Sequence, residues 1–151
     1  MPAENPDSTM DIHILKTYDS DSHKQINHLL HQLNPDSPGV SESRLIELLE
    51  NAGFFLFIAR NETNKIIGML TLTACQTLSY TKYWIEDVIV NKGFRGLGAG
   101  EALLEAALTH VKAIEEQPKI YLTSNPTRIA ARNLYRSKGF EEYNTGVFRI
   151  I

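Results

Sequence analysis

Two adjacent carboxylates interrupt one of the most apolar segments of this sequence. Glu86 and Asp87 lie within "YWIEDVIV" (residues 83–90), in which every other side chain is aromatic or aliphatic. Acidic side chains are unusual in such a segment, and in that setting they are suited to proton transfer or to holding a cation. The pair therefore predicts a functional site, with a solvated strand edge as the alternative interpretation.

A glycine-rich turn follows directly. Four glycines fall between Gly93 and Gly100, where the apolar segment gives way to a helical pattern. Backbone N–H groups at the start of a helix attract anions, and the guanidinium of Arg95 is suited to phosphate. Neither the P-loop nor the G-x-G-x-x-G dinucleotide motif fits, because Ala99 and Glu101 stand where those motifs need other residues. We predict an anion site of a different type; the alternative is that the glycines let the helix pack closely on a sheet.

The hydrophobic pattern predicts the elements that position these residues. Strands are expected where apolar residues alternate or run together, and helices where they recur every three to four residues. The expected strands are 11–18, 54–60, 65–75, 83–90 and 119–125, with one or two short strands in 140–150, and the expected helices are 22–33, 41–52, 98–115 and 127–138. This order predicts the α+β class, with one sheet covered by helices on both faces. Residues 1–9 are expected to form a flexible tail and residues 10–151 a single domain.

Composition restricts the class of protein further. The chain has 151 residues and a net charge of −3, which argues against a nucleic-acid partner because such proteins carry a basic surface. No apolar run has the length of a membrane span, and the first ten residues lack the features of a signal peptide. The single cysteine, Cys75, has no partner for an internal disulfide. We expect a cytoplasmic protein with no membrane partner.

Two sequence motifs resemble those of the GCN5-related N-acetyltransferases (the GNAT family). Arg95-x-x-Gly98-x-Gly100 matches the family pattern Q/R-x-x-G-x-G/A and follows an apolar strand, as in the family. A second family motif is similar to "RIAARNLYRSKGF" (residues 128–140), through Ala131, Leu134, Tyr135, Gly139 and Phe140. The order of elements resembles that of the family from residue 11 to the C-terminus. Within the family, the Glu-Asp pair in the fourth strand is most similar to the diamine and polyamine acetyltransferases.

The resemblance implies a fold and a co-substrate. The GNAT fold has a mixed, mostly antiparallel sheet of six to seven strands, splayed between strands 4 and 5, and four helices on its two faces. Acetyl-CoA is the expected co-substrate, with no metal. Its pantetheine arm would bond to the backbone near Val88 and Val90, with the thioester in the gap of the sheet. Its pyrophosphate would lie on the turn, which comprises Arg95, Gly96, Leu97, Gly98, Ala99 and Gly100.

The residues, together with the resemblance, indicate how the reaction would proceed. An amine that attacks a thioester needs to lose a proton, and the departing thiolate needs to gain one. Glu86 is the candidate base, acting through water, and strand alternation would put it on the same face as Val88 and Val90. In a regular strand Asp87 would point to the opposite face, whereas a bulge like that of the family would re-aim it to bind a cationic acceptor. Tyr135 matches the family's general acid for the sulfur of CoA, with core packing as the alternative.

Other side chains are candidates for the same site. Trp84 and Tyr83 flank the acceptor side and would line its pocket, with core packing as the alternative. Family members often carry Asn seven residues before the tyrosine, and here that position is Arg128. Arg128 would contact a CoA phosphate or an acidic acceptor instead, and Asn125 is a further candidate for binding the co-substrate.

The function predicted from these residues is acetyl-CoA-dependent N-acetylation of a primary amine, on a small molecule or a protein, by direct attack in a ternary complex. Cys75 lies on the third predicted strand, away from both motifs, which argues against an acyl-enzyme. The alternative is a non-catalytic acyl-CoA-binding sensor of the same fold. The resemblance also allows a homodimer, since dimers are frequent in the family.

Overall fold

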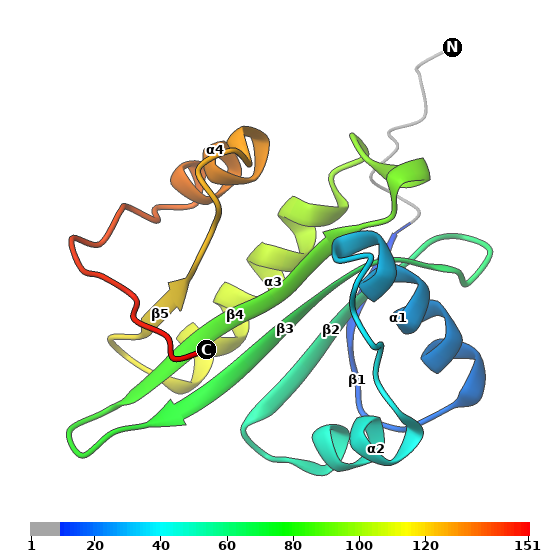
Figure 1. The fold of residues 1–151 in the computed structure, drawn as a ribbon, viewed down its shortest axis with the longest axis horizontal. Coiled ribbons are helices and arrows are strands. Elements are labelled where there is room, and N and C mark those ends of the chain that lie inside the picture. The colour runs from blue at the N-terminus through cyan, green and yellow to red at the C-terminus, as the bar shows by residue number, and fades with distance from the viewer. Residues whose placement is uncertain (1–9) are drawn as a thin grey trace.

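A five-stranded sheet in the order β1-β2-β3-β4-β5 runs through residues 10–151, the part of the chain that the computed structural model describes (Figure 1). The strands are β1 (Asp11–Leu15), β2 (Phe54–Arg60), β3 (Ile66–Gln76), β4 (Thr81–Val90) and β5 (Lys119–Leu122). Neighbours from β1 to β4 are antiparallel, whereas β5 runs parallel to β4. The sheet is therefore mixed and mostly antiparallel, as predicted. The tail predicted for residues 1–9 lies outside the described residues.

Within residues 10–151, four α-helices cover the two faces of this sheet. α1 (Ser20–Leu33) and α2 (Glu42–Glu50) lie on one face and α3 (Ala99–Ile114) on the other, as Figure 1 shows. One apolar cluster packs beneath α1 and α2, and a second packs beneath α3. α4 (Ile129–Ser137) contributes the buried Tyr135 to the α3 cluster. The prediction of four helices on both faces is confirmed. None of the described helices combines the length and the apolar content needed to cross a bilayer.

Local sequence signals set the starts of the helices beside the site. The side chain of Asp19 accepts a hydrogen bond of 2.8 Å from Ser22 N, which satisfies a donor that the first turn of α1 leaves free. Ser41 Oγ caps α2 in the same way, with Arg44 N at 3.3 Å. Because Asp19 is the N-cap, α1 begins at Ser20, two residues before the predicted start.

β4 and β5 are paired along only part of β4. The parallel pairing ends at Ile85 and Leu122, and Leu122 is the last residue of β5. β4 continues to Val90, so that its outer edge from Glu86 onward has no strand partner within residues 10–151. The two strands separate at this point, as the resemblance implied, and the separation positions the site described below.

The predicted number of strands is wrong, because the described residues form five and not six to seven. The missing strands are those expected in 140–150, a segment without regular secondary structure. β5, whose Tyr121 ring contacts Tyr143 of this segment, has four residues and offers a short edge for pairing. Asn144 and Gly146 add turn-forming residues, and Phe148 stays 97% exposed. The apolar residues of 140–150 therefore do not form a strand, because they have no long strand edge with which to pair.

Candidate active site

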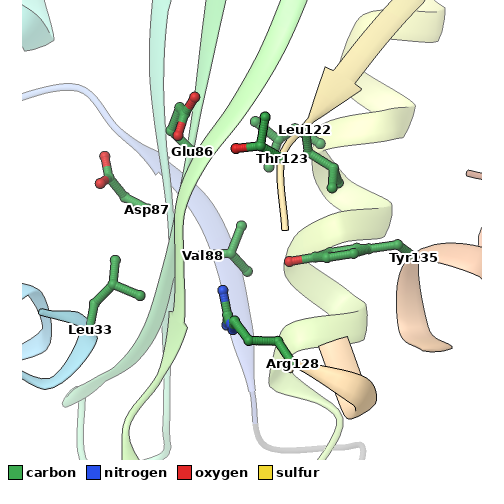
Figure 2. A pocket seen from close by; sticks show the side chains of 9 residues that line it. Leu33, Glu86, Asp87, Val88, Leu122, Thr123, Arg128 and Tyr135 are labelled. Carbon is green, nitrogen blue, oxygen red and sulfur yellow. The ribbon is translucent and has the colours of Figure 1, made fainter. Parts of the chain in front are cut away.

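A cavity of about 190 Å³ lies where β4 and β5 separate. Side chains from α1, β4, the end of β5 and the α4 region line it; they are Leu33, Ile85, Glu86, Asp87, Val88, Leu122, Thr123, Arg128 and Tyr135. Figure 2 shows the Tyr135 hydroxyl and the Arg128 guanidinium pointing towards Val88, with the two carboxylates farther along β4. The structure therefore brings together the carboxylate pair and the second motif, which are far apart in the sequence.

A β-bulge at Asp87 reshapes β4 beside this cavity. Asp87 has φ 50°, a left-handed conformation that is uncommon for a residue other than glycine. The register with β3 shifts between Met69 and Thr71, opposite the bulge. The Thr71 hydroxyl donates a hydrogen bond of 3.0 Å to Asp87 Oδ2, and both side chains line a second cavity beneath α1 and α2. The bulge that the resemblance made conditional is therefore present, and it turns Asp87 toward the face covered by α1 and α2.

The bulge also decides on which face Glu86 lies. Ile85 packs in the α3 cluster and Ile89 in the α1–α2 cluster, although residues four apart in a regular strand share a face. Val88 and Val90 pack against the α3 cluster, as Ile85 does, whereas Glu86 precedes the bulge and points to the other face. The prediction that Glu86 shares a face with Val88 and Val90 is wrong, because the extra residue of the bulge reverses the alternation. Glu86 and Val88 nevertheless line the same cavity.

The surroundings of Glu86 favour proton transfer. Burial, and then the negative charge of the neighbouring Asp87, raise the pKa of Glu86 above its ordinary value. A carboxylate with a raised pKa is a stronger base than an ordinary surface carboxylate. The side chain is still exposed enough for water to reach it. Glu86 is therefore able to accept a proton from an amine, directly or through a water molecule.

Tyr135 is a buried part of the cavity wall. Its side chain is 5% exposed, and its ring lies 6.2 Å from that of Phe140. Burial raises the pKa of Tyr135, and the positive charge of Arg128 partly offsets this effect. The hydroxyl consequently keeps its proton near neutral pH and is a donor. Tyr135 therefore packs in the core through its ring and directs its hydroxyl at the cavity, so the two interpretations are compatible.

Two glycines of the turn adopt a conformation that side chains disfavour. Gly96 has φ 82° and Gly98 has φ 86°, and a Cβ at either position would meet no atom within 4 Å. A Cβ at Gly100 would make ordinary contacts, the nearest of them 3.6 Å from Val90 Cγ2. Close packing of α3 on the sheet does not require these glycines, so this alternative interpretation is not supported. The turn instead leaves open space in front of its backbone.

The start of α3 directs backbone donors into that space. Gly98 is the N-cap, and the first helical bond runs from Ala102 N to Gly98 O at 3.0 Å, so that the three N–H groups between them are free of intrahelical partners. Arg95 Nε donates to Val90 O at 3.2 Å, which orients the guanidinium beside the turn. Leu97 is half exposed. A diphosphate such as that of acetyl-CoA would be bound by these features, since backbone donors, the helix dipole and a guanidinium all attract phosphate.

Besides Val90 and the turn residues, three predicted site residues do not line the cavity: Tyr83, Trp84 and Asn125. Tyr83 is 5% exposed on the α3 face, where its hydroxyl donates to Glu115 Oε1 at 3.2 Å, which favours the alternative of core packing for this residue. Trp84 lies on the opposite face and stacks on Tyr121, with ring centroids 5.2 Å apart. Asn125 Oδ1 accepts two hydrogen bonds within the loop between β5 and α4. The roles of Trp84 in acceptor binding and of Asn125 in co-substrate binding stay predictions.

Sequence reasoning missed several residues that shape the site. Leu122 and Thr123 line the cavity because β5 ends beside Ile85, and strand pairing of this kind leaves no local pattern. Leu33 is the last residue of α1 and reaches the cavity through the packing of that helix on the sheet. Thr71 is 5% exposed, and its one signal in the sequence is a hydroxyl within an apolar strand.

Metal binding and the free thiol are the two remaining chemical questions at this site. Within residues 10–151, no three histidine, cysteine or carboxylate side chains are grouped as a metal site would need. The expectation of a metal-free reaction stays a prediction. Cys75 is exposed and lies opposite Lys82, four positions before Glu86 on β4.

The family of the chain follows from a comparison with known proteins. The model of the acetyltransferase (GNAT) family matches residues 19–140, which is most of the chain. The chain therefore belongs to the GNAT family of N-acetyltransferases, which use acetyl-CoA as co-substrate. No curated protein sequence matches it.

Solved structures share the fold over nearly the whole chain. An aminoglycoside acetyltransferase from an uncultured soil metagenomic sample, in complex with sisomicin, has a TM-score of 0.82 and 20% identity, over 96% of this chain and 98% of its own. A putative acetyltransferase from Agrobacterium tumefaciens has a TM-score of 0.77 and 22% identity, over 93% of this chain and 99% of its own. Glucosamine-6-phosphate N-acetyltransferase from Arabidopsis thaliana has a TM-score of 0.76 and 21% identity, over 93% of this chain and 98% of its own. At these identities the likeness shows the fold.

Proposed function

We propose that the protein transfers the acetyl group of acetyl-CoA to a primary amine by direct attack within a ternary complex. The observation that carries this proposal is the one cavity at which Glu86, Asp87, Val88 and Tyr135 meet. A base, a carboxylate for a cationic acceptor and a proton donor are the groups that this reaction needs. The glycine turn lies at the end of the same strand, so that the co-substrate and the acceptor would approach the cavity from different sides.

The turn of residues 95–100 is the proposed binding site for the diphosphate of CoA. Its support is the open space at Gly96 and Gly98, the free N–H groups at the start of α3, and the cation of Arg95. The pantetheine arm would follow the edge of β4 near Val88 and Val90, where no strand of the described chain competes for the backbone groups. Acetyl-CoA bound in this way supplies an acetyl thioester at the cavity.

The residues of the chain would then move two protons and stabilise one charge. Glu86 takes a proton from the amine through water, and Asp87 holds a cationic part of the acceptor. A backbone N–H near Val88 donates to the carbonyl oxygen on which negative charge develops. The Tyr135 hydroxyl gives its proton to the departing sulfur as the C–S bond breaks. Direct attack requires no acyl-enzyme, which is compatible with the position of Cys75 on β3.

The acceptor is a primary amine on a small molecule or a protein. The Glu-Asp pair in β4 is similar to that of diamine and polyamine acetyltransferases and favours a cationic acceptor. Two proteins of the same fold are named for aminoglycoside and glucosamine-6-phosphate substrates, in which the amine is carried by a sugar. A primary amine is the feature that these classes share, and a homodimer stays a further prediction.

A thiol-release assay with acetyl-CoA and a panel of amines tests the proposal. Initial rates with both substrates varied should give intersecting lines in double-reciprocal plots, and Cys75→Ser should retain activity. Parallel lines together with an inactive Cys75→Ser variant would contradict direct attack. A chain that binds CoA but releases no thiol with any amine would instead support the non-catalytic sensor.

A further inference from the structure

A second cavity adjoins the first, and Asp87 lines both. It has a volume of about 60 Å³ and lies between the sheet and the helices α1 and α2. Eight apolar side chains line it, from α1, α2, the loop between them, β2 and β3, and its two polar residues are Thr71 and Asp87. The second cavity is therefore an apolar chamber with a carboxylate at the side that faces the first cavity.

The carboxylate is held in place by a buried donor. Thr71 is 5% exposed, and its hydroxyl donates to Asp87 Oδ2 at 3.0 Å. The left-handed backbone at Asp87 directs the side chain to this face, and this conformation costs free energy in a residue other than glycine. Asp87 itself remains exposed to solvent. With one oxygen oriented by Thr71, the other is available to an ammonium group. The charge of Asp87 has no cation among the other residues that line this cavity.

The outer wall of the second cavity is formed before any ligand binds. Val40, in the loop between α1 and α2, is fixed to α1 through the Asn27 side chain, which accepts from Val40 N at 2.7 Å and donates to Val40 O at 3.1 Å. His23 Nε2 makes a further hydrogen bond of 2.6 Å to Val40 O. Because these residues are already fixed, a ligand does not have to order them when it binds. The cavity is therefore a preorganised site.

We propose that this second cavity receives a short alkyl substituent of the acceptor, so that the preferred substrate is a small aliphatic monoamine rather than a diamine. The inference rests on the proposed function and specifies its acceptor. The amine nitrogen would lie at Asp87, facing Glu86, and its carbon chain would extend away from the thioester beneath α1 and α2. A second ammonium at the far end of that chain would be desolvated among apolar side chains without a partner.

The size of the second cavity limits the substituent. About 60 Å³ is several times the roughly 10–15 Å³ that one water requires, and less than half of the roughly 150 Å³ that accepts benzene. The chamber therefore suits a few carbon atoms. Each methylene that enters it should improve binding about fourfold, which corresponds to about 0.8 kcal/mol. The improvement should stop once the chain is longer than the chamber.

The test measures the binding of amines to the CoA complex by ligand-observed NMR, together with kcat/KM for acetylation. Affinity should rise from methylamine to butylamine and fall for hexylamine and benzylamine. Butylamine should bind at least tenfold more tightly than 1,3-diaminopropane, in which an ammonium replaces the terminal methyl. A flat series, or equal binding of this matched pair, would overturn the inference. Binding that follows the series in a chain that acetylates none of these amines would refute the proposed function but not this site.

Two variants of one helix separate the second cavity from general packing. Leu48→Phe reduces the cavity, because Leu48 lines it at a half-buried position of α2, and butylamine should then bind about tenfold more weakly. Leu49→Phe makes the same change at the next residue, which packs on the core cluster beneath α1 and α2 but does not line the cavity, and butylamine binding should stay within twofold. Equal losses in both variants, or none in Leu48→Phe, would contradict the assignment. If Leu48→Phe does not fold, Val40→Phe fills the same cavity from the loop and has the same expected result.

Discussion

Glu86 and Asp87 are neighbours in sequence, but the backbone gives them different surroundings. The bulge directs Asp87 to the Thr71 hydroxyl, which favours a fixed carboxylate that holds a cation. Glu86 lines only the larger cavity, where burial and the charge of Asp87 raise its pKa. Two identical functional groups are therefore suited to separate tasks, and removing them should have separable effects.

Substitution of the proposed base should reduce activity without reducing stability. Glu86→Gln should lower kcat/KM by roughly 10²–10⁴-fold and remove the acid limb of the pH–rate profile, because the ionised carboxylate is the active form. Since the folded-state pKa of Glu86 is raised, the stability it contributes is present below the unfolded-state pKa and is lost as pH rises through the folded-state pKa. At neutral pH, the free energy of unfolding of the variant should therefore be equal to or above that of the parent.

Asp87→Asn is the comparison and should mainly raise KM for the amine. An acid limb that is unchanged in Glu86→Gln would exclude Glu86 as the base.

The proton donor is expected to have a smaller effect. Tyr135→Phe removes the hydroxyl but keeps the buried ring, so the fold should be retained. Turnover should fall about tenfold and not vanish, because the thiolate of a thiol with a pKa of about 8.5 is a fair leaving group without assistance. The affinity for CoA should change little. Tyr80→Phe, on the exposed hairpin loop before β4, is the control, and an equal loss of turnover there would show that tyrosine removal acts through folding.

At the scale of elements, the turn between β4 and α3 offers a matched pair of substitutions. Gly98→Ala adds a Cβ at φ 86° and should lower the free energy of unfolding by about 1 kcal/mol. The same Cβ would stand in the proposed diphosphate site, so that calorimetry should show CoA binding at least roughly tenfold weaker. Gly139→Ala carries the same strain at φ 93°, again with no atom within 4 Å, but lies at the end of α4. It should lose similar stability and keep its affinity for CoA; equal losses of affinity in both variants would remove the turn from the binding site.

Most elements of the fold could be predicted from local patterns, because caps and apolar spacing act within a few residues. The bulge at Asp87 could not, since it depends on the register with β3 and on the Thr71 hydroxyl. That one residue is the reason why Glu86 and Val88 lie on different faces. Strands expected in 140–150 failed for a related reason, because a strand needs an edge to pair with.

The candidate site was partly predictable for the same physical reasons. Motifs in the sequence indicated the turn and Tyr135, whose conformations are set by neighbouring residues. The sequence left Tyr83 open between the acceptor side and the core, because an aromatic residue beside the site has the same pattern in either place, and Tyr83 packs in the core. The second cavity beneath α1 and α2 left no signal, since apolar side chains that line a chamber look like any buried helix stripe.

At the scale of the whole molecule, the site lies between two parts that are buried to unequal extents. β3 has eleven residues, and its first seven are buried, whereas none of the four residues of β5 is fully buried. α4 buries Tyr135 alone among its nine residues. Lys138 ties the end of α4 to α3 through Glu101 Oε1 at 2.6 Å and Glu105 Oε1 at 2.8 Å. The proposed proton donor is therefore carried by the part of the fold with the fewest buried groups.

This asymmetry predicts how the protein responds to its co-substrate. Amide hydrogen exchange should be fast in β5 and α4 and slow in β2 and β3, because local opening follows the number of buried groups. A ligand that bridges the glycine turn and the gap between β4 and β5 binds the closed form, so CoA should slow exchange in α4 as well as in residues 88–102. Lys138→Met should speed exchange in α4 of the free protein and leave β2 and β3 unchanged, since it removes the tie to α3 alone. Protection confined to the turn, with α4 unaffected by CoA, would show that the α4 side takes no part in holding the co-substrate.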